Sequence, residues 1–158
     1  MEIEPILTEV LNVPIDSCQL EDVTIDVVSL WDKDSDPAVF INRKSLMGRK
    51  KWGRRMALAH ELCRLIFDTE EGKSLGIASG RWVPVELEQC ANASAAEILL
   101  PSSALERDAS GLSEGKNFDK LMNRFKVGAT TAANRLRDLG IIDEPVFNHL
   151  ISKYSARY

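Results

Sequence analysis

Apolar residues recur along the chain with two different periods, and together these predict a domain of the α+β class. The stretch 23–31 (VTIDVVSLW) is rich in β-branched residues, and turn-forming residues separate it from a second apolar run at 38–42. These two segments predict a hairpin or part of a small antiparallel sheet. Within 51–67, Leu58, Leu62, Leu65 and Ile66 fall at i, i+4, i+7 and i+8. This spacing predicts a central helix that buries the leucine stripe.

Further helices are predicted on both sides of these elements. A short amphipathic helix is expected at 3–12. The stretch 85–100 is rich in helix formers and alanine and ends at Pro101, which cannot continue a helix. Two helices joined by a tight glycine-containing turn are expected within 117–140, followed by a last helix at 145–154. The remaining connections are predicted to be a glycine-rich segment at 70–80 and a loop with one helical turn at 102–117.

Size and composition predict one domain spanning 1–158, with the sheet and two helices in 20–101 and a helical part in 102–158. A chain of 158 residues with 44% hydrophobic residues can bury a sufficient core without disulfides or a structural metal. No apolar run is long enough to span a membrane, and the first residues lack the basic region of a signal peptide. We therefore expect a cytoplasmic protein with no membrane partner, whose widely spaced cysteines stay reduced.

Charge is distributed unevenly along the chain. The segment 43–55 carries seven of the 20 basic residues and no acidic one, so the rest of the chain has 13 basic against 24 acidic residues. Such a basic segment could attract nucleic acid or an acidic partner. A solvated loop that runs into a helix is the more common reason for such a segment.

The central predicted helix contains a histidine followed directly by a glutamate, in RMALAHELCRLIFD. In an HExxH helix, two histidines at i and i+4 hold zinc from one face, and the glutamate acts as general base toward the metal-bound water. Here His60 and Glu61 match the first two positions, whereas Arg64 stands at the second histidine position. The frame of such a site is therefore present without its full ligand set.

Three blocks of sequence make a resemblance specific enough to name. RRMALAHELCRLIFD, CANASAAEILLPSSAL and FKVGATTAANRLRDLGII resemble, in order and spacing, the active helix, the second helix and the C-terminal helical segment of the ImmA/IrrE family of HExxH metallopeptidase-like proteins. With the preceding hairpin, the resemblance covers about 20–142. It implies a zincin-like α+β fold and a zinc held by both histidines of HExxH and by a glutamate two residues before the asparagine of the second helix.

This sequence departs from the implied ligand set at two positions. His60 matches the first ligand and Glu61 the general base, but Arg64 takes the second ligand position and Cys90, in Cys90-Ala91-Asn92, takes the third. A thiolate can bind zinc, so Cys90 is compatible with a metal. A guanidinium has no lone pair to offer, and at about 4 Å from Zn²⁺ its repulsion is on the order of 8 kcal/mol at an effective dielectric of about 20. A complete structural zinc site contributes only roughly 10–16 kcal/mol.

Several arrangements remain open for this site. The guanidinium of Arg64 could occupy the metal position and pair with Glu61 or with a carboxylate of the second helix such as Glu97, and we favour this metal-free reading. A set of His60, Cys63 and Cys90 is an alternative, although a buried cysteine is usually a small hydrophobe. His149 has no partner pattern around it and is expected at the surface, and Trp31, Trp52 and Trp82 are expected in the core or at its rim.

The C-terminal helix pair offers a different class of function. It has the outline of a DNA-reading helix-turn-helix, in which base edges or phosphates could be reached by Thr131, Asn134, Arg135 and Arg137. The acidic character of the whole chain disfavours this reading, and the basic segment 43–55 supports it.

The sequence thus predicts a catalytically degenerate member of the resembled family that needs no cofactor. Proteins of that family act on helix-turn-helix repressors of mobile elements or stress responses, which implies such a regulator as the partner. The first alternative is an active zinc endopeptidase with His60 and Cys90 as ligands and Glu61 as base, and the second is a DNA-binding protein.

Overall fold

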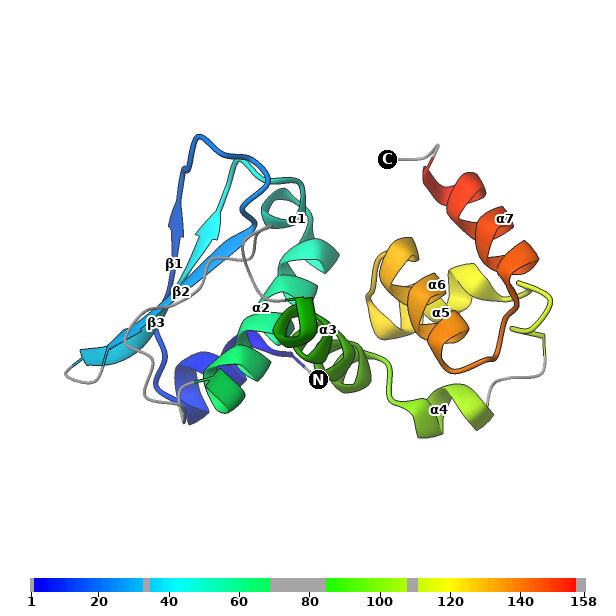
Figure 1. Cartoon of the computed structure of the whole chain (residues 1–158), viewed down its shortest axis with the longest axis horizontal. Coiled ribbons are helices and arrows are strands. Elements are labelled where there is room, and N and C mark those ends of the chain that lie inside the picture. The colour runs from blue at the N-terminus through cyan, green and yellow to red at the C-terminus, as the bar shows by residue number, and fades with distance from the viewer. Residues whose placement is uncertain (1, 33–34, 69–84, 108–110, 156–158) are drawn as a thin grey trace. The chain divides into compact units, whose positions relative to one another are not determined.

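A computed structural model describes residues 2–32, 35–68, 85–107 and 111–155 (Figure 1). The chain divides into two compact units, 1–95 and 96–158, and the boundary between them falls inside one helix. The predicted α+β class is confirmed. In the described part of the chain, no helix has both the length and the apolar composition needed to cross a membrane.

The first unit is built on a sheet of three strands. They are β1 (Ile15–Cys18), β2 (Val27–Asp32) and β3 (Ser35–Asn42), in the order β1-β3-β2. β2 and β3 form the predicted antiparallel hairpin, with an irregularity between Leu30 and Asp32. β1 was not predicted and pairs with β3 in parallel, so the sheet is mixed instead of antiparallel. Its four residues carry no apolar alternation by which the sequence could have revealed it.

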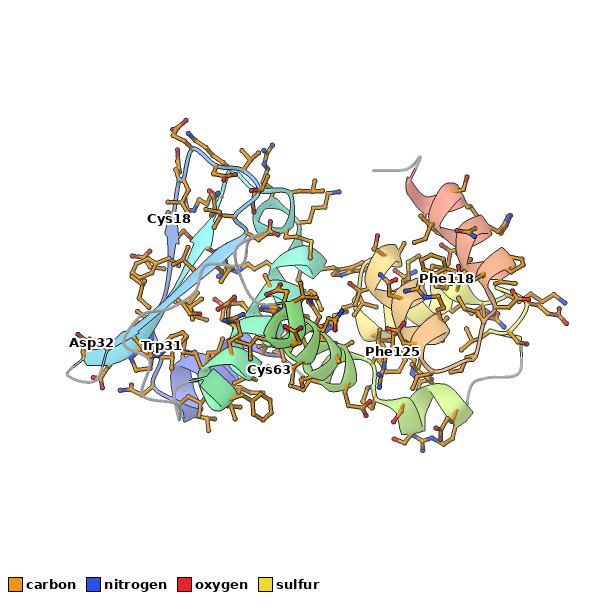
Figure 2. All side chains as sticks on the ribbon, in the orientation of Figure 1. Cys18, Trp31, Asp32, Cys63, Phe118 and Phe125 are labelled. Carbon is orange, nitrogen blue, oxygen red and sulfur yellow. The ribbon has the colours of Figure 1, made fainter. Side chains whose placement is uncertain are left out.

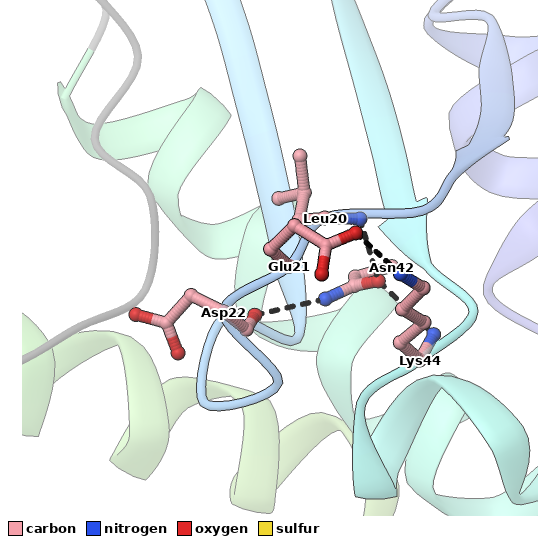
Figure 3. A network of polar contacts seen from close by, with 5 residues as sticks. All are labelled: Leu20, Glu21, Asp22, Asn42 and Lys44. Atoms are coloured by element: carbon pink, nitrogen blue, oxygen red, sulfur yellow. Dashed lines mark hydrogen bonds and ion pairs between the residues drawn. The ribbon is translucent and has the colours of Figure 1, made fainter.

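One buried side chain holds the long connection between β1 and β2 in place. The side chain of Asn42, at the end of β3, is fully buried; its Oδ1 accepts from the backbone N–H groups of Leu20 and Lys44 at 3.1 and 3.0 Å. Its Nδ2 donates to the carbonyls of Asp22 and Ile25 at 3.1 and 2.9 Å. Figure 3 shows this side chain at the centre of the network. Asn42 therefore supplies the hydrogen bonds that an irregular backbone segment needs.

Helices accompany the sheet within the first unit. A single π-helical turn, η1 (Ile6–Val10), replaces the longer helix predicted at 3–12. The short α1 (Leu46–Arg49) leads into α2 (Lys51–Asp68), which is the predicted central helix and packs against β2 and β3. Buried apolar side chains of the two strands and α2 belong to the core, among them Val27, Trp31, Val39, Ile41, Leu58 and Leu62. Ile66, predicted in the buried stripe, is instead 49% exposed in the last turn of α2.

The second unit is helical. α3 (Val85–Leu99) contains the boundary between the units, and it is followed by α4 (Ser102–Arg107), α5 (Phe118–Phe125), α6 (Ala129–Asp138) and α7 (Glu144–Ser155). The predicted helices are all found, and α4 is the helical turn expected in the loop after Pro101. Leucines from several of these helices are buried, and so is Phe118, whose ring centroid lies 5.2 Å from that of Tyr154.

Some of the remaining predictions concern residues that the structure describes, and others do not. His149 is exposed as expected, Trp31 is buried and Trp52 is half-buried. The predicted glycine-rich connection at 70–80 and Trp82 lie outside the described residues. The cysteines of the described chain are free thiols, as predicted from their spacing.

Candidate functional site

Two adjacent turns of α2 bury polar side chains where an ordinary core helix would bury only apolar ones. His60, Glu61 and Arg64 are 5, 0 and 1% exposed, respectively. Charged residues are almost never buried to this degree unless they are paired. The pairing of these three side chains therefore defines the candidate site, which lies within the first unit. Figure 2 labels Cys63, a residue of the same helix.

His60 is held between two residues of α3. Its Nδ1 lies 3.1 Å from Oδ1 of Asn92, and because that oxygen can only accept, Nδ1 is assigned as the donor. Its Nε2 is buried and faces Oε2 of Glu88 at 3.6 Å. Asn92 thus fixes the orientation of the imidazole in the way that a supporting residue fixes a metal-binding histidine.

Arg64 faces the same carboxylate. Its Nη1 lies 3.4 Å from Oε2 of Glu88, the oxygen that also faces His60. Residues 60 and 64 are one helical turn apart on α2, as 88 and 92 are on α3, so the two helices meet through matched turns. Glu88 remains 30% exposed, whereas the guanidinium is buried. A fixed cation therefore stands beside the histidine inside the fold.

Glu61 points to the sheet. The hydroxyl of Ser29, a fully buried residue of β2, donates to its Oε2. This contact ties α2 to β2 through two polar groups that would otherwise be costly to bury. A general base must reach a water molecule, and Glu61 has no exposed surface in this arrangement. Its role as base stays a prediction.

The other residues expected at the site lie elsewhere. Cys90 is exposed on α3, and Glu97 pairs with Arg135 in the second unit instead of with Arg64. Cys63 is buried, and this burial, with a smaller contribution from Cys90, raises the pKa of its thiol to about 11. A thiol with that pKa is protonated at neutral pH and would have to release its proton to bind a metal. The set of His60, Cys63 and Cys90 stays a prediction.

Sequence reasoning missed Glu88, and helical geometry explains why. Cys90 is two residues before Asn92, which turns its side chain by about 200° around the helix axis. Glu88 is four residues before Asn92 and shares its face. The pair Glu88 and Asn92 at i and i+4, opposite His60 and Arg64 at i and i+4, was the signal that could have found it. The assignment of Cys90 as a metal ligand stays a prediction; its side chain is exposed on α3.

The arginines predicted to read DNA are engaged inside the second unit. Arg135 pairs with Glu97 and donates to the carbonyl of Leu100. Arg137 lies over the ring of Phe147, with Cζ 4.2 Å from the ring centroid, and donates to Asn134. Thr131 is half-buried. These contacts occupy most of the side chains on which the helix-turn-helix reading depends.

The residues at His60 match a zinc site only in part. Two ligands of a tetrahedral zinc lie roughly 3.4 Å apart, close to the 3.6 Å between Nε2 of His60 and Oε2 of Glu88. The position of the second HExxH histidine carries the guanidinium of Arg64, and within the described ranges no group of three His, Cys, Asp or Glu side chains could hold a metal ion. His60 and Glu88 are thus two of the ligands that a tetrahedral zinc would need.

The fold and the helix with its His-Glu pair define a zincin-like α+β domain. The family model described as the IrrE N-terminal-like domain, of the peptidase M78 type, matches residues 8–137. The chain belongs to this family of ImmA/IrrE-like metallopeptidase domains, as its sequence blocks predicted. No curated protein matches the chain in sequence.

Proposed function

We propose that this protein is a catalytically degenerate member of its family that binds a regulatory protein without cleaving it. The observation that carries the proposal is the buried guanidinium of Arg64, which pairs with Glu88 beside His60. A divalent ion at His60 would face this fixed positive charge at short range. The ion pair gives Glu88 the cation that a metal would otherwise supply.

The proposed partner is a helix-turn-helix transcriptional regulator of a mobile element or a stress response. This part rests on the family, whose members act on such regulators. β2 supports a binding role because it lies at an edge of the sheet and packs against α2. An edge strand can pair with an extended peptide through main-chain hydrogen bonds, and this needs no metal.

The first test separates binding from cleavage. Purified protein is mixed with the helix-turn-helix regulators encoded nearest to it, and complexes are measured by size-exclusion chromatography while intact mass reports cleavage. A complex with both masses unchanged supports the proposal. Cleavage that depends on His60 and added zinc would overturn it, as would the absence of any complex with these regulators.

A second test asks whether Arg64 alone excludes the metal. Arg64→His should bind one equivalent of zinc, and chelator should lower its melting temperature but not that of the wild type, because His60 and Glu88 already have ligand spacing. Glu88→Gln in this background should abolish zinc binding, whereas Cys90→Ser should leave it intact. Stoichiometric zinc in the wild-type protein, lost in His60→Ala, would contradict the proposal.

An active zinc peptidase is the second candidate. The observation that favours it is the orientation of His60 by Asn92, which leaves Nε2 directed at Glu88 as a ligand would be. It requires Arg64 to turn out of the interior. Metal analysis of the wild-type protein distinguishes the two candidates.

A further inference from the structure

The connection between β3 and α2 carries cations that its surroundings do not neutralise. Some cations of the basic segment are paired, since Lys44 lies 2.6 Å from Glu21 and Arg54 lies 2.9 Å from Glu4. Glu2 acts electrostatically on Arg55, although burial is the larger influence and lowers the pKa of that guanidinium. These acidic residues thus neutralise only some of the cations in the segment.

Three cations of the segment stay uncompensated. Arg43 and Lys51 are exposed, and their side chains make no hydrogen bond or ion pair with any described residue. Arg49 is also exposed and donates to the backbone carbonyl of Lys44, which is a neutral acceptor. Lys51 stands in the first turn of α2, where no acidic residue offsets the unfavourable interaction of a cation with the helix dipole.

These cations are mounted on a rigid backbone. Ser45 caps α1 by accepting from the N–H of Gly48 at 2.9 Å and donates to the carbonyl of Asn42. A Cβ at Gly48 would lie 2.1 Å from that carbonyl oxygen, and one at Gly53 would lie 2.7 Å from the carbonyl oxygen of Met47. The close approach fixes α1 against the end of β3 and the start of α2. The cations therefore project from a preformed surface.

An apolar side chain in the same place indicates the class of partner. Leu46, in the first turn of α1, is 63% exposed among the three cations. Contacts to phosphate use charged and polar groups, whereas protein interfaces combine apolar anchors with arginine and a polar rim. The rest of the chain carries 24 acidic residues against 13 basic ones and would repel a polyanion such as DNA over a wide area.

We propose that this α1 surface, defined by Arg43, Leu46, Arg49 and Lys51, binds an acidic segment of a protein partner that presents an apolar side chain to Leu46. Lys51, the residue of this surface nearest to His60 in the sequence, stands nine residues before it, about 13 Å along the axis of α2. Peptide binding at the α1 surface can therefore be measured independently of the His60 site. The proposal also does not depend on whether the His60 site cleaves a peptide bond.

The test uses the full-length protein and a short fluorescent peptide in which aspartates and glutamates flank one leucine. Fluorescence anisotropy at about 50 and 300 mM salt gives the affinity and its salt dependence. Arg43→Gln, Arg49→Gln and Lys51→Gln combined should weaken binding about tenfold at low salt and remove most of the salt dependence. Leu46→Ser should weaken binding about threefold, but not for a peptide whose leucine is replaced by serine.

A matched control removes the same number of positive charges from the second unit. Arg107, Lys120 and Lys153 are exposed, and Arg107 donates to the carbonyl of Ser103 much as Arg49 donates to that of Lys44. Their combined change to glutamine should leave peptide binding unaltered, with circular dichroism confirming the fold of every variant. An equal loss in this control, no peptide binding at low salt, or binding of duplex DNA in preference to the peptide would each overturn the proposal.

Discussion

Two arginine–glutamate pairs involve residues of α3, and they differ in what surrounds them. Arg64 of α2 pairs with Glu88 where the side chains are 1 and 30% exposed. Arg135 of α6 pairs with Glu97 in the second unit, where they are 12 and 49% exposed. Arg135 also donates to the carbonyl of Leu100 just after α3, a group that a helix end leaves without an internal partner. The second pair thus has an evident structural role.

The comparison shows that packing alone does not account for Arg64. A buried ion pair is often no more stabilising than apolar residues of the same volume, because desolvation offsets the attraction. The Arg64 pair adjoins a histidine and a glutamate that are also buried, and such clusters of ionisable groups are typical of functional sites. Under the proposed function, the polar groups of α2 are the retained frame of a family site, whereas Arg135 belongs to the architecture of the second unit.

The largest expected effect is a difference in the free energy of unfolding that is lost when the arginine of each pair is replaced. Arg64→Met should lower the free energy of unfolding by about 3 kcal/mol because it leaves Glu88 and His60 without their cation. Arg135→Met should cost only about 1 kcal/mol because its partner is half-exposed and solvated. Urea denaturation of both variants measures this difference. Equal losses would show that the environment of Arg64 is not special.

The contact between α2 and the sheet should give the next effect. Ser29→Ala removes the hydroxyl that donates to Glu61 and should cost about 1–2 kcal/mol, because the carboxylate stays buried with one donor fewer. Ser17→Ala, on the half-buried face of β1, is the control for a serine lost from the sheet. If both variants unfold at the same urea concentration, Glu61 does not depend on Ser29.

The smallest expected effect concerns pH and Cys63. Burial raises the pKa of this thiol to about 11 in the folded protein, so the folded state holds the proton more tightly than the unfolded chain, whose thiol titrates near about 8.5. The stabilisation is fully present below about pH 8.5 and is lost as pH rises through about 11. The advantage of the wild type over Cys63→Ala in unfolding free energy should therefore shrink across this window.

The control for that measurement is Cys90→Ala, because the thiol of Cys90 is exposed. Its difference from the wild type should stay constant over the same pH window. A constant difference for Cys63→Ala as well would show that the Cys63 thiol is not sheltered from water.

The sequence predicted those elements whose own residues carry the periodic pattern. It did not predict features that depend on how one element pairs with another. The hairpin of β2 and β3 and the helix α2 follow from the periodicity of their own residues. β1 has only the residues IDSC and owes its strand conformation to β3, which lies more than 20 residues later. No local pattern carries that information.

The candidate site divides in the same way. His60, Glu61 and Arg64 could be predicted because they lie in one helix with a known spacing. Their partners could not, because the phase of α3 decides whether Glu88 or Cys90 faces α2, and a shift of two residues turns the helix to its other side. Glu97 was a reasonable candidate partner for Arg64 by charge alone, but Arg135 takes it.

The side chain of Asn42 has a consequence for how this protein can vary. One amide serves four backbone groups drawn from both flanks of its strand, two as acceptor and two as donor. Aspartate has the acceptors without the donors, and glutamine has both on a longer arm, so no single exchange conserves the arrangement. A chimera that takes the 19–26 connection from a relative must therefore take position 42 from the same relative. The connection and position 42 have to be exchanged together, although β2 and most of β3 separate them in the sequence.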